Sequence, residues 1–121
     1  MSAWAWTGVA GLGALGAIAR FLLDGLVEAR ARATLPLGTL LVNASGSLLL
    51  GLLTGLAASG ELLVLAGAAA IGSYTTFSTW MLETHRLSED ADIAGAIVNV
   101  LVTLAVGVAA AALGRVVGAQ I

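Results

Sequence analysis

The stretch GSYTTFSTWMLE, residues Gly72–Glu83, decides which fold and which kind of function the chain can have. It closes an apolar run that begins at Leu62, yet six of the seven residues from 73 to 79 carry a hydroxyl group. The aromatic residues Phe77 and Trp80 stand three positions apart, so they share a face if the segment is helical. Hydroxyl groups beside aromatic rings at membrane depth predict a path lined for a polar solute.

The whole chain has the composition of an integral membrane protein. Of its 121 residues, 60% are hydrophobic and 10% are charged, whereas soluble domains are about 25% charged. The sequence holds no cysteine and one histidine, so we expect neither a disulfide nor a transition-metal centre. The formal net charge of −2 gives no basic surface, and nucleic acid is not an expected partner.

Four segments are apolar over the roughly 20 residues that a membrane-spanning helix needs. They cover approximately residues 3–23, 35–58, 62–82 and 93–117. We therefore expect an all-α, multi-pass protein of the cell membrane in which residues 1–121 form a single transmembrane domain. The short connections leave no soluble domain to hold an active site, so an enzyme is not expected.

The arginine residues predict how the chain crosses the membrane. Four of the five lie in or near the loops after the first and third spans: Arg20, Arg30, Arg32 and Arg86. The opposite side holds only Arg115. Because positively charged loops stay in the cytoplasm, this bias favours both termini outside and one fixed orientation.

The sixteen glycines fall mainly within the expected helices. Two GxxxG pairs stand out, Gly51 with Gly55 and Gly114 with Gly118. Small residues let helix backbones approach closely, although they are also common in membrane helices without any special role. Together the glycines predict a tightly packed bundle, and four thin helices predict a second copy of the chain beside it.

Arg20 lies near the end of the first span and has two interpretations. It can extend to the membrane surface and pair with Asp24, four residues later on the same helix face. Alternatively it acts in function, by setting a positive potential at an anion entrance or by anchoring a neighbouring helix.

A polar stripe runs along the second span at intervals of four residues and consists of Thr39, Asn43 and Ser47. The fourth span repeats this spacing with Asn99 and Thr103. Such residues often only make hydrogen bonds between helices. They can also form an anion or water track with the fourth span as the opposing wall, because amide and hydroxyl groups donate without carrying charge. In that case Thr39, Asn43 and Thr103 belong to the ion pathway.

The hydroxyl cluster after Gly72 makes a poor continuous helix, because its β-branched and hydroxyl residues compete with helical hydrogen bonds. A break at residues 72–75 would leave backbone carbonyls unpaired in the membrane, where they need protein, water or a cation. Broken helices at mid-membrane commonly build ion sites, and sodium prefers oxygen ligands. Alternatively, the hydroxyl groups bond to carbonyls one turn earlier and the helix stays whole.

These residues together resemble the Fluc (CrcB) family of fluoride channels along essentially the full length of the chain. The order, spacing and total length agree, and the TTFST segment combined with the GT…VN…G segment is a specific signature. The resemblance is carried by GLGALGAIARFLL (Gly11–Leu23), PLGTLLVNASGSLLLG (Pro36–Gly51), GSYTTFSTWMLE (Gly72–Glu83) and ALG (Ala112–Gly114).

The resemblance implies a fold and a set of site residues. Members are four-helix proteins that form antiparallel, dual-topology-type dimers, with a break in the third helix and two fluoride pores along the dimer interface. A sodium ion at the dimer centre would be held by the backbone carbonyls of Gly72 and Thr75. The ion pathway would include the matching polar and aromatic positions Asn43, Phe77, Ser78, Thr79 and Trp80.

The function implied is a fluoride-selective channel that exports fluoride passively and lowers its cytoplasmic concentration. Its partners would be the fluoride ion, membrane lipid and a second subunit, which is either an identical copy or a homologous chain. Aromatic ring edges carry partial positive charge and amides donate without charge, so such a pore can accept fluoride without a cationic trap.

Two positions depart from the family pattern. Trp80 stands where the family has a second phenylalanine, and Asn99 replaces a common tyrosine. With the arginine bias, these departures keep open a subunit of a heterodimeric channel that does not conduct alone. A small multidrug exporter is a further alternative, but proton-coupled antiport needs a carboxylate within the membrane. The first span has none, and Glu61 and Glu83 lie at helix ends.

Overall fold

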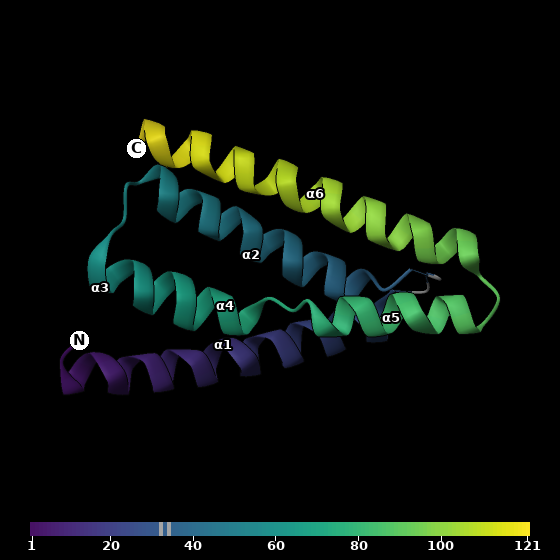
Figure 1. The fold of residues 1–121 in the computed structure, drawn as a ribbon, viewed down its shortest axis with the longest axis horizontal. Helices are drawn as coiled ribbons and strands as arrows, with labels where there is room; N and C mark the ends of the chain where they lie inside the picture. Colours follow the sequence, from purple (N-terminus) through teal and green to yellow (C-terminus); the bar gives the residue numbers. More distant parts are fainter. Residues whose placement is uncertain (32, 34) are drawn as a thin grey trace.

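The computed structural model describes residues 1–31, 33 and 35–121. In that part of the chain, four helical stretches are long and apolar enough to cross a membrane: Ala3–Arg30, Leu37–Gly55, Gly60–Glu89 and Ile93–Gln120. These four stretches lie roughly side by side and are joined by short connections (Figure 1). The predicted all-α, four-span membrane fold is confirmed.

Three of these spans are single helices and the third is composite. The elements in chain order are α1 (Ala3–Arg30), α2 (Leu37–Gly55), α3 (Gly60–Leu62), η1 (Leu63–Ile71), α4 (Gly72–Tyr74), α5 (Ser78–Glu89) and α6 (Ile93–Gln120). The segment η1 is a π-helix and continues directly into α4. Between α4 and α5 the ribbon loses its helical coil, which divides the third span into two halves (Figure 1).

The break in the third span lies later than expected. We predicted it at residues 72–75, but Gly72–Tyr74 is helical and the interruption covers residues 75–77. Thr75 is extended, with φ −80° and ψ 160°. Helix propensity locates a weak point in a helix only to within about one turn. The position of the break also depends on which backbone groups find other hydrogen-bond partners.

Three helices extend beyond the limits that hydropathy predicts, and one of them is α6, which runs past residue 117 to Gln120. The helix α1 runs past residue 23 to Arg30 and includes Asp24 and Glu28, while α5 runs past residue 82 to Glu89. Hydropathy marks where the apolar layer ends, but backbone hydrogen bonds continue the helix into water. Arg32, which contributes to the predicted orientation, lies outside the described residues.

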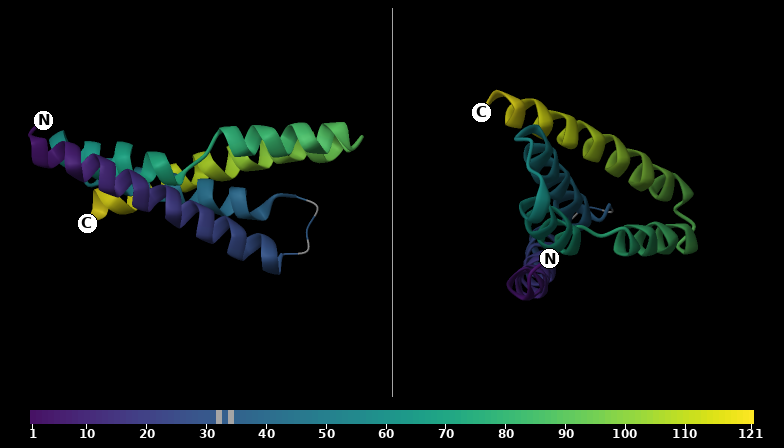
Figure 2. Two further views of the ribbon diagram at one scale, coloured as in Figure 1. Left: turned by 90° about the horizontal axis from the view of Figure 1, so that it is seen from below. Right: turned by 60° about the vertical axis from the view of Figure 1, so that its left-hand side comes forward.

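Glycines set the distance between α2 and α6, which run side by side in Figure 1 and lie close together near the C-terminus in the right view of Figure 2. A Cβ added at Gly51 or Gly55 would collide with the backbone carbonyls of α6, at Ala111 and Arg115. A Cβ at Gly114 or Gly118 would collide with carbonyls of α2. The two GxxxG pairs therefore occupy the same interface, one on each helix, and confirm the predicted close packing.

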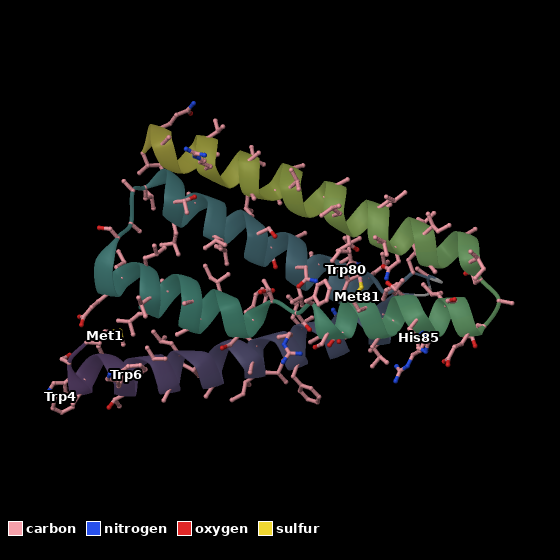
Figure 3. The ribbon with its side chains drawn as sticks, viewed as in Figure 1. Met1, Trp4, Trp6, Trp80, Met81 and His85 are labelled. Atoms are coloured by element: carbon pink, nitrogen blue, oxygen red, sulfur yellow. The ribbon has the colours of Figure 1, made fainter. Side chains whose placement is uncertain are left out.

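Large apolar side chains point outward rather than into a core. Trp4 and Trp6 are 85% and 63% exposed at the start of α1, and Figure 3 shows them projecting away from the bundle. Tryptophan favours the membrane–water boundary, so these two side chains suit an interfacial position. A lipid environment favours this arrangement, in which small residues pack closely between the helices and large apolar side chains face outward.

The variant Gly51→Ala tests the α2–α6 contact. The added methyl group would meet the Ala111 carbonyl, and we expect a loss of about 1–3 kcal/mol in the free energy of unfolding, which is the usual cost of overpacking. Gly11→Ala is the matched control, because a Cβ there meets no atom within 4 Å. Unfolding by SDS in mixed micelles, followed by circular dichroism, measures both. Equal stability of the two variants would contradict the close packing.

Candidate functional site

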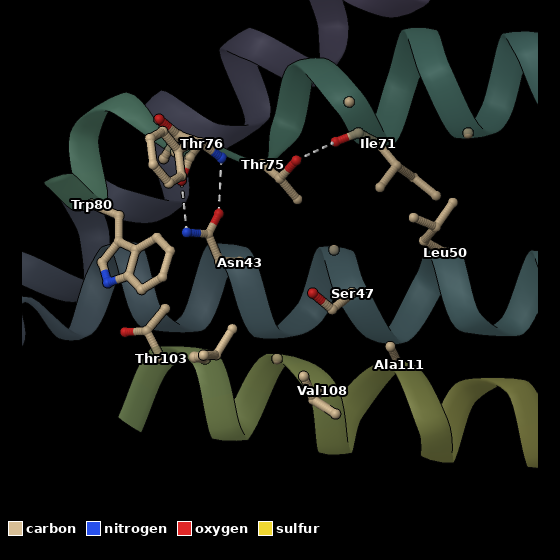
Figure 4. A pocket seen from close by; sticks show the side chains of 16 residues that line it. Asn43, Ser47, Leu50, Ile71, Thr75, Thr76, Trp80, Thr103, Val108 and Ala111 are labelled. Carbon is tan, nitrogen blue, oxygen red and sulfur yellow. Dashed lines mark hydrogen bonds between the residues drawn. The ribbon is translucent and has the colours of Figure 1, made fainter. Parts of the chain in front are cut away.

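A pocket of about 480 Å³ lies where α2, the break and α6 meet. Its apolar walls carry a small number of polar groups, and no charged side chain is found among the described residues that line it. Figure 4 shows these side chains converging from α2, the third span and α6. The polar and aromatic lining residues are Asn43, Ser47, Thr75, Thr76, Phe77, Trp80 and Thr103.

The carboxamide of Asn43 pairs with the backbone of the break. Its Nδ2 donates to the Thr76 carbonyl at 2.8 Å, and its Oδ1 accepts from the Thr76 N–H at 2.8 Å (Figure 4). Thr76 has no helical partner for either group, because it lies between α4 and α5. Asn43 thus replaces the hydrogen bonds that the interruption removes, and one Nδ2–H remains for another acceptor.

Hydroxyl groups of the cluster make hydrogen bonds at both ends of the break. The Thr75 hydroxyl donates back to the Ile71 carbonyl at 3.1 Å, which closes the end of α4. The Thr76 hydroxyl accepts from the Thr79 N–H at 3.2 Å and caps the start of α5. Ser78 lies 3.4 Å from the Thr76 hydroxyl and is exposed. Neither Ser78 nor Thr79 lines the pocket, although both are predicted pathway residues.

Three backbone carbonyls in and just after α4 differ in whether they accept a hydrogen bond. The Ser73 carbonyl accepts from Nε of Arg20 at 3.4 Å. The carbonyls of Gly72 and Thr75 accept no hydrogen bond from any residue that the structure describes. Arg20 therefore contacts the neighbouring span, and within the described residues it forms no ion pair with Asp24.

Phe77 and Trp80 form the aromatic wall of the pocket. Their ring centroids are 5.8 Å apart at an interplanar angle of 86°, so the rings meet edge to face. Phe77 is 70% exposed, whereas Trp80 is half-buried and its Nε1 donates to the Asn99 carbonyl at 3.2 Å. The two predicted aromatic pathway residues are thus brought together at the mouth of the pocket.

The remaining predicted pathway residues separate into two groups. Thr103 is buried and lines the pocket. Thr39 is 2% exposed and donates instead to Oε1 of Glu83 at 3.0 Å, outside the pocket. Ser47 lines the pocket but was not among the predicted pathway residues, although its spacing of four residues from Asn43 was a usable signal.

An interrupted span beside a polar-lined pocket is typical of membrane transport proteins, which commonly build ion sites from broken helices. The profile of the CrcB-like protein family, Camphor Resistance (CrcB), matches residues 7–115. The chain belongs to this family.

Relatives of known description agree over nearly the whole chain. The fluoride-specific ion channel FluC 2 of Mycolicibacterium paratuberculosis is 53% identical over 91% of this chain and 90% of its own length. FluC 1 of Symbiobacterium thermophilum is 42% identical over 95% and 96%. FluC 2 of Haloarcula marismortui is 48% identical over 77% and 76%. These proteins are named as ion channels, which confirms the predicted non-enzymatic, multi-pass membrane protein and sets the multidrug exporter aside.

The variant Asn43→Leu tests whether the carboxamide supports the break. Leucine keeps the size of the side chain but leaves the Thr76 N–H and carbonyl unpaired. An unpaired buried group costs about 1–3 kcal/mol, so amide exchange at Thr76 should accelerate by roughly tenfold or more. Hydrogen exchange followed by mass spectrometry measures it. Ser47→Ala, one turn away on α2, is the control and should leave the Thr76 amide protected. Unchanged exchange in Asn43→Leu would remove this role.

Proposed function

We propose that the chain is a fluoride-selective channel that exports fluoride passively across the cell membrane and lowers its cytoplasmic concentration. The observation that carries the proposal is the pocket beside the break, which combines amide, hydroxyl and aromatic groups with no charged side chain among the described lining residues. Family membership and the names of the relatives support the same function.

The lining suits a small anion that must both enter and leave. Conduction requires binding that is strong enough to replace water and weak enough to release the ion. A lysine or arginine in the pocket would hold fluoride as a charge pair. Asn43 has one N–H free, and Ser47 and Thr103 add hydroxyl groups, so each donor is neutral. The edges of Phe77 and Trp80 add a weak positive potential.

The pore is completed by a second subunit in antiparallel orientation. One chain forms only one wall, because Phe77 is 70% exposed and a Cβ at Gly72 would meet only open space beyond the Gly67 carbonyl at 3.7 Å. Polar groups facing hydrocarbon are costly, so the open side of the pocket favours protein over lipid. Two copies that meet at this face would supply opposite walls of the pathway.

A sodium ion at the centre of the dimer would be held by the carbonyls of Gly72 and Thr75. These two carbonyls accept no hydrogen bond from the described residues, and hard cations take such neutral oxygen ligands. Bound sodium would supply charge that ties the two breaks together. Gly72 is exposed, which leaves its carbonyl within reach of a partner chain.

Reconstitution of the purified chain into liposomes tests the channel. Liposomes loaded with potassium fluoride, opened by valinomycin and a protonophore, should release fluoride to an external electrode. Efflux from this chain alone supports an identical pair of subunits. Efflux only after co-reconstitution with a homologous chain supports a heterodimer. Absence of efflux in both cases contradicts the channel.

The variant Asn43→Asp tests whether the anion passes beside Asn43, although it also removes the Nδ2 donor to the Thr76 carbonyl. It keeps an oxygen to accept the Thr76 N–H but places a fixed negative charge beside the pocket. Repulsion of the anion should reduce efflux by at least about tenfold, the effect of roughly 1.4 kcal/mol. Unchanged efflux would remove Asn43 from the pathway.

Replacing sodium tests the cation site separately. Protein purified and reconstituted in N-methylglucamine instead of sodium should show lower thermal stability as a dimer, because the free carbonyls lose their partner. Size-exclusion chromatography after heating measures the dimer that survives. The same stability in both cations would remove sodium from the proposal and leave the channel untouched.

A further inference from the structure

Trp80, Thr84 and Asn99 form a closed loop of three hydrogen bonds between α5 and α6. Trp80 Nε1 donates to the main-chain carbonyl of Asn99 at 3.2 Å, and the side-chain Nδ2 of Asn99 donates to the Thr84 hydroxyl at 2.9 Å. The Thr84 hydroxyl donates in turn to the Trp80 carbonyl at 2.8 Å. Each residue both gives and receives a bond, and such networks strengthen in a low-dielectric environment.

The loop decides which edge of the indole faces the pocket. In Figure 4 the six-membered ring of Trp80 points toward Asn43, while the ring nitrogen lies on the opposite edge. The N–H group is the one strong donor of this side chain, and it is occupied by the Asn99 carbonyl. The pocket therefore meets carbon–hydrogen edges, which carry only partial positive charge.

We infer that Asn99 and Thr84 are positioning residues that set anion selectivity. Their side-chain hydrogen bond fixes α6 against α5, so that the main-chain carbonyl of Asn99 keeps the Trp80 N–H turned away from the pocket. The inference rests on the proposed fluoride channel. Neither residue lines the pocket, so both act through the orientation of the indole. Asn99 is 4% exposed, which leaves it no solvent-facing role.

The orientation matters because the two edges would treat an anion differently. A free N–H aimed into the pocket would form a charge-assisted hydrogen bond with any halide and would hold it. A mobile indole would also widen the pocket, because Trp80 packs edge to face against Phe77 at a centroid distance of 5.8 Å. A fixed ring keeps the pocket narrow, which discriminates against a larger anion, and keeps the field of the wall weak enough for the ion to be released.

The ordinary alternative is that the loop only fastens α5 to α6. Both roles predict that loss of a bond loosens the helix pair, but only the positioning role predicts a change in the motion of the indole together with a change in selectivity. The test therefore needs one spectroscopic readout and one transport readout.

The experiment uses the full chain with Trp4→Phe and Trp6→Phe, so that Trp80 is the sole tryptophan. Both replaced residues are exposed at the start of α1, far along the chain from the loop. In this background, Thr84→Val and Asn99→Leu each remove the Asn99–Thr84 bond at nearly constant size. Thr84→Ser, which keeps the hydroxyl, is the matched control for Thr84→Val, and Ile97→Ala, on the exposed face of α6, is the control for Asn99→Leu.

We expect the fluorescence anisotropy of Trp80 to fall in Thr84→Val and in Asn99→Leu. The ratio of fluoride to chloride efflux should fall about threefold in each, the effect of one hydrogen bond between membrane helices. The double variant should be no worse than Thr84→Val alone, because both substitutions remove the same Asn99–Thr84 bond. Both controls should keep the parent anisotropy and selectivity.

Other results overturn the inference. Unchanged anisotropy in both variants means that the loop does not hold the ring, and lower anisotropy with unchanged selectivity means that the ring orientation does not govern transport. If one variant yields no folded protein the other carries the test, and loss of both makes the loop purely structural. No fluoride efflux from the Trp4→Phe, Trp6→Phe parent, alone or with a homologous partner, speaks against the channel instead, while anisotropy still tests the positioning.

Discussion

The two hydrogen bonds between Asn43 and Thr76 are the constraint on which the rest of the structure depends. A helix that stops inside a membrane leaves N–H and carbonyl groups without water, and each unpaired group costs several kcal/mol. A carboxamide carries the same donor and acceptor as a peptide group, so one side chain can satisfy both groups of Thr76 at 2.8 Å. The third span can therefore remain interrupted where a polar site is needed.

This pairing requires α2 to lie at a fixed distance from the break and from α6. Gly46 lets α2 approach the break, because a Cβ there would collide with the Thr75 side chain. Gly51 and Gly55 let the same helix approach α6 through its carbonyls. Since a Cβ on either side would move the carboxamide of Asn43 away from Thr76, the glycines of α2 serve the site as well as the packing.

Hydropathy was sufficient to predict the four spans, whereas helix propensity left both a broken and a whole third helix open and the family resemblance implied the interruption. None of these could place the interruption, because Asn43 and Thr76 are 33 residues apart and only the fold brings them together. Spacing paired Arg20 with Asp24 on one helix, yet Arg20 contacts Ser73, 53 residues away. The resemblance drew attention to Trp80 and Asn99 separately, but only the packing of α5 against α6 reveals the hydrogen bond between them.

The polar groups of the site are largely committed to the protein itself, and this limits how firmly the proposed channel can hold an anion. Asn43 gives its oxygen and one N–H to Thr76, and Trp80 gives its N–H to Asn99. What remains toward the pocket is one amide N–H, a few hydroxyl groups and ring edges. An array of weak neutral donors can replace water one contact at a time without forming a deep energy minimum. The same bonds that keep the broken span stable therefore also favour the release of the ion.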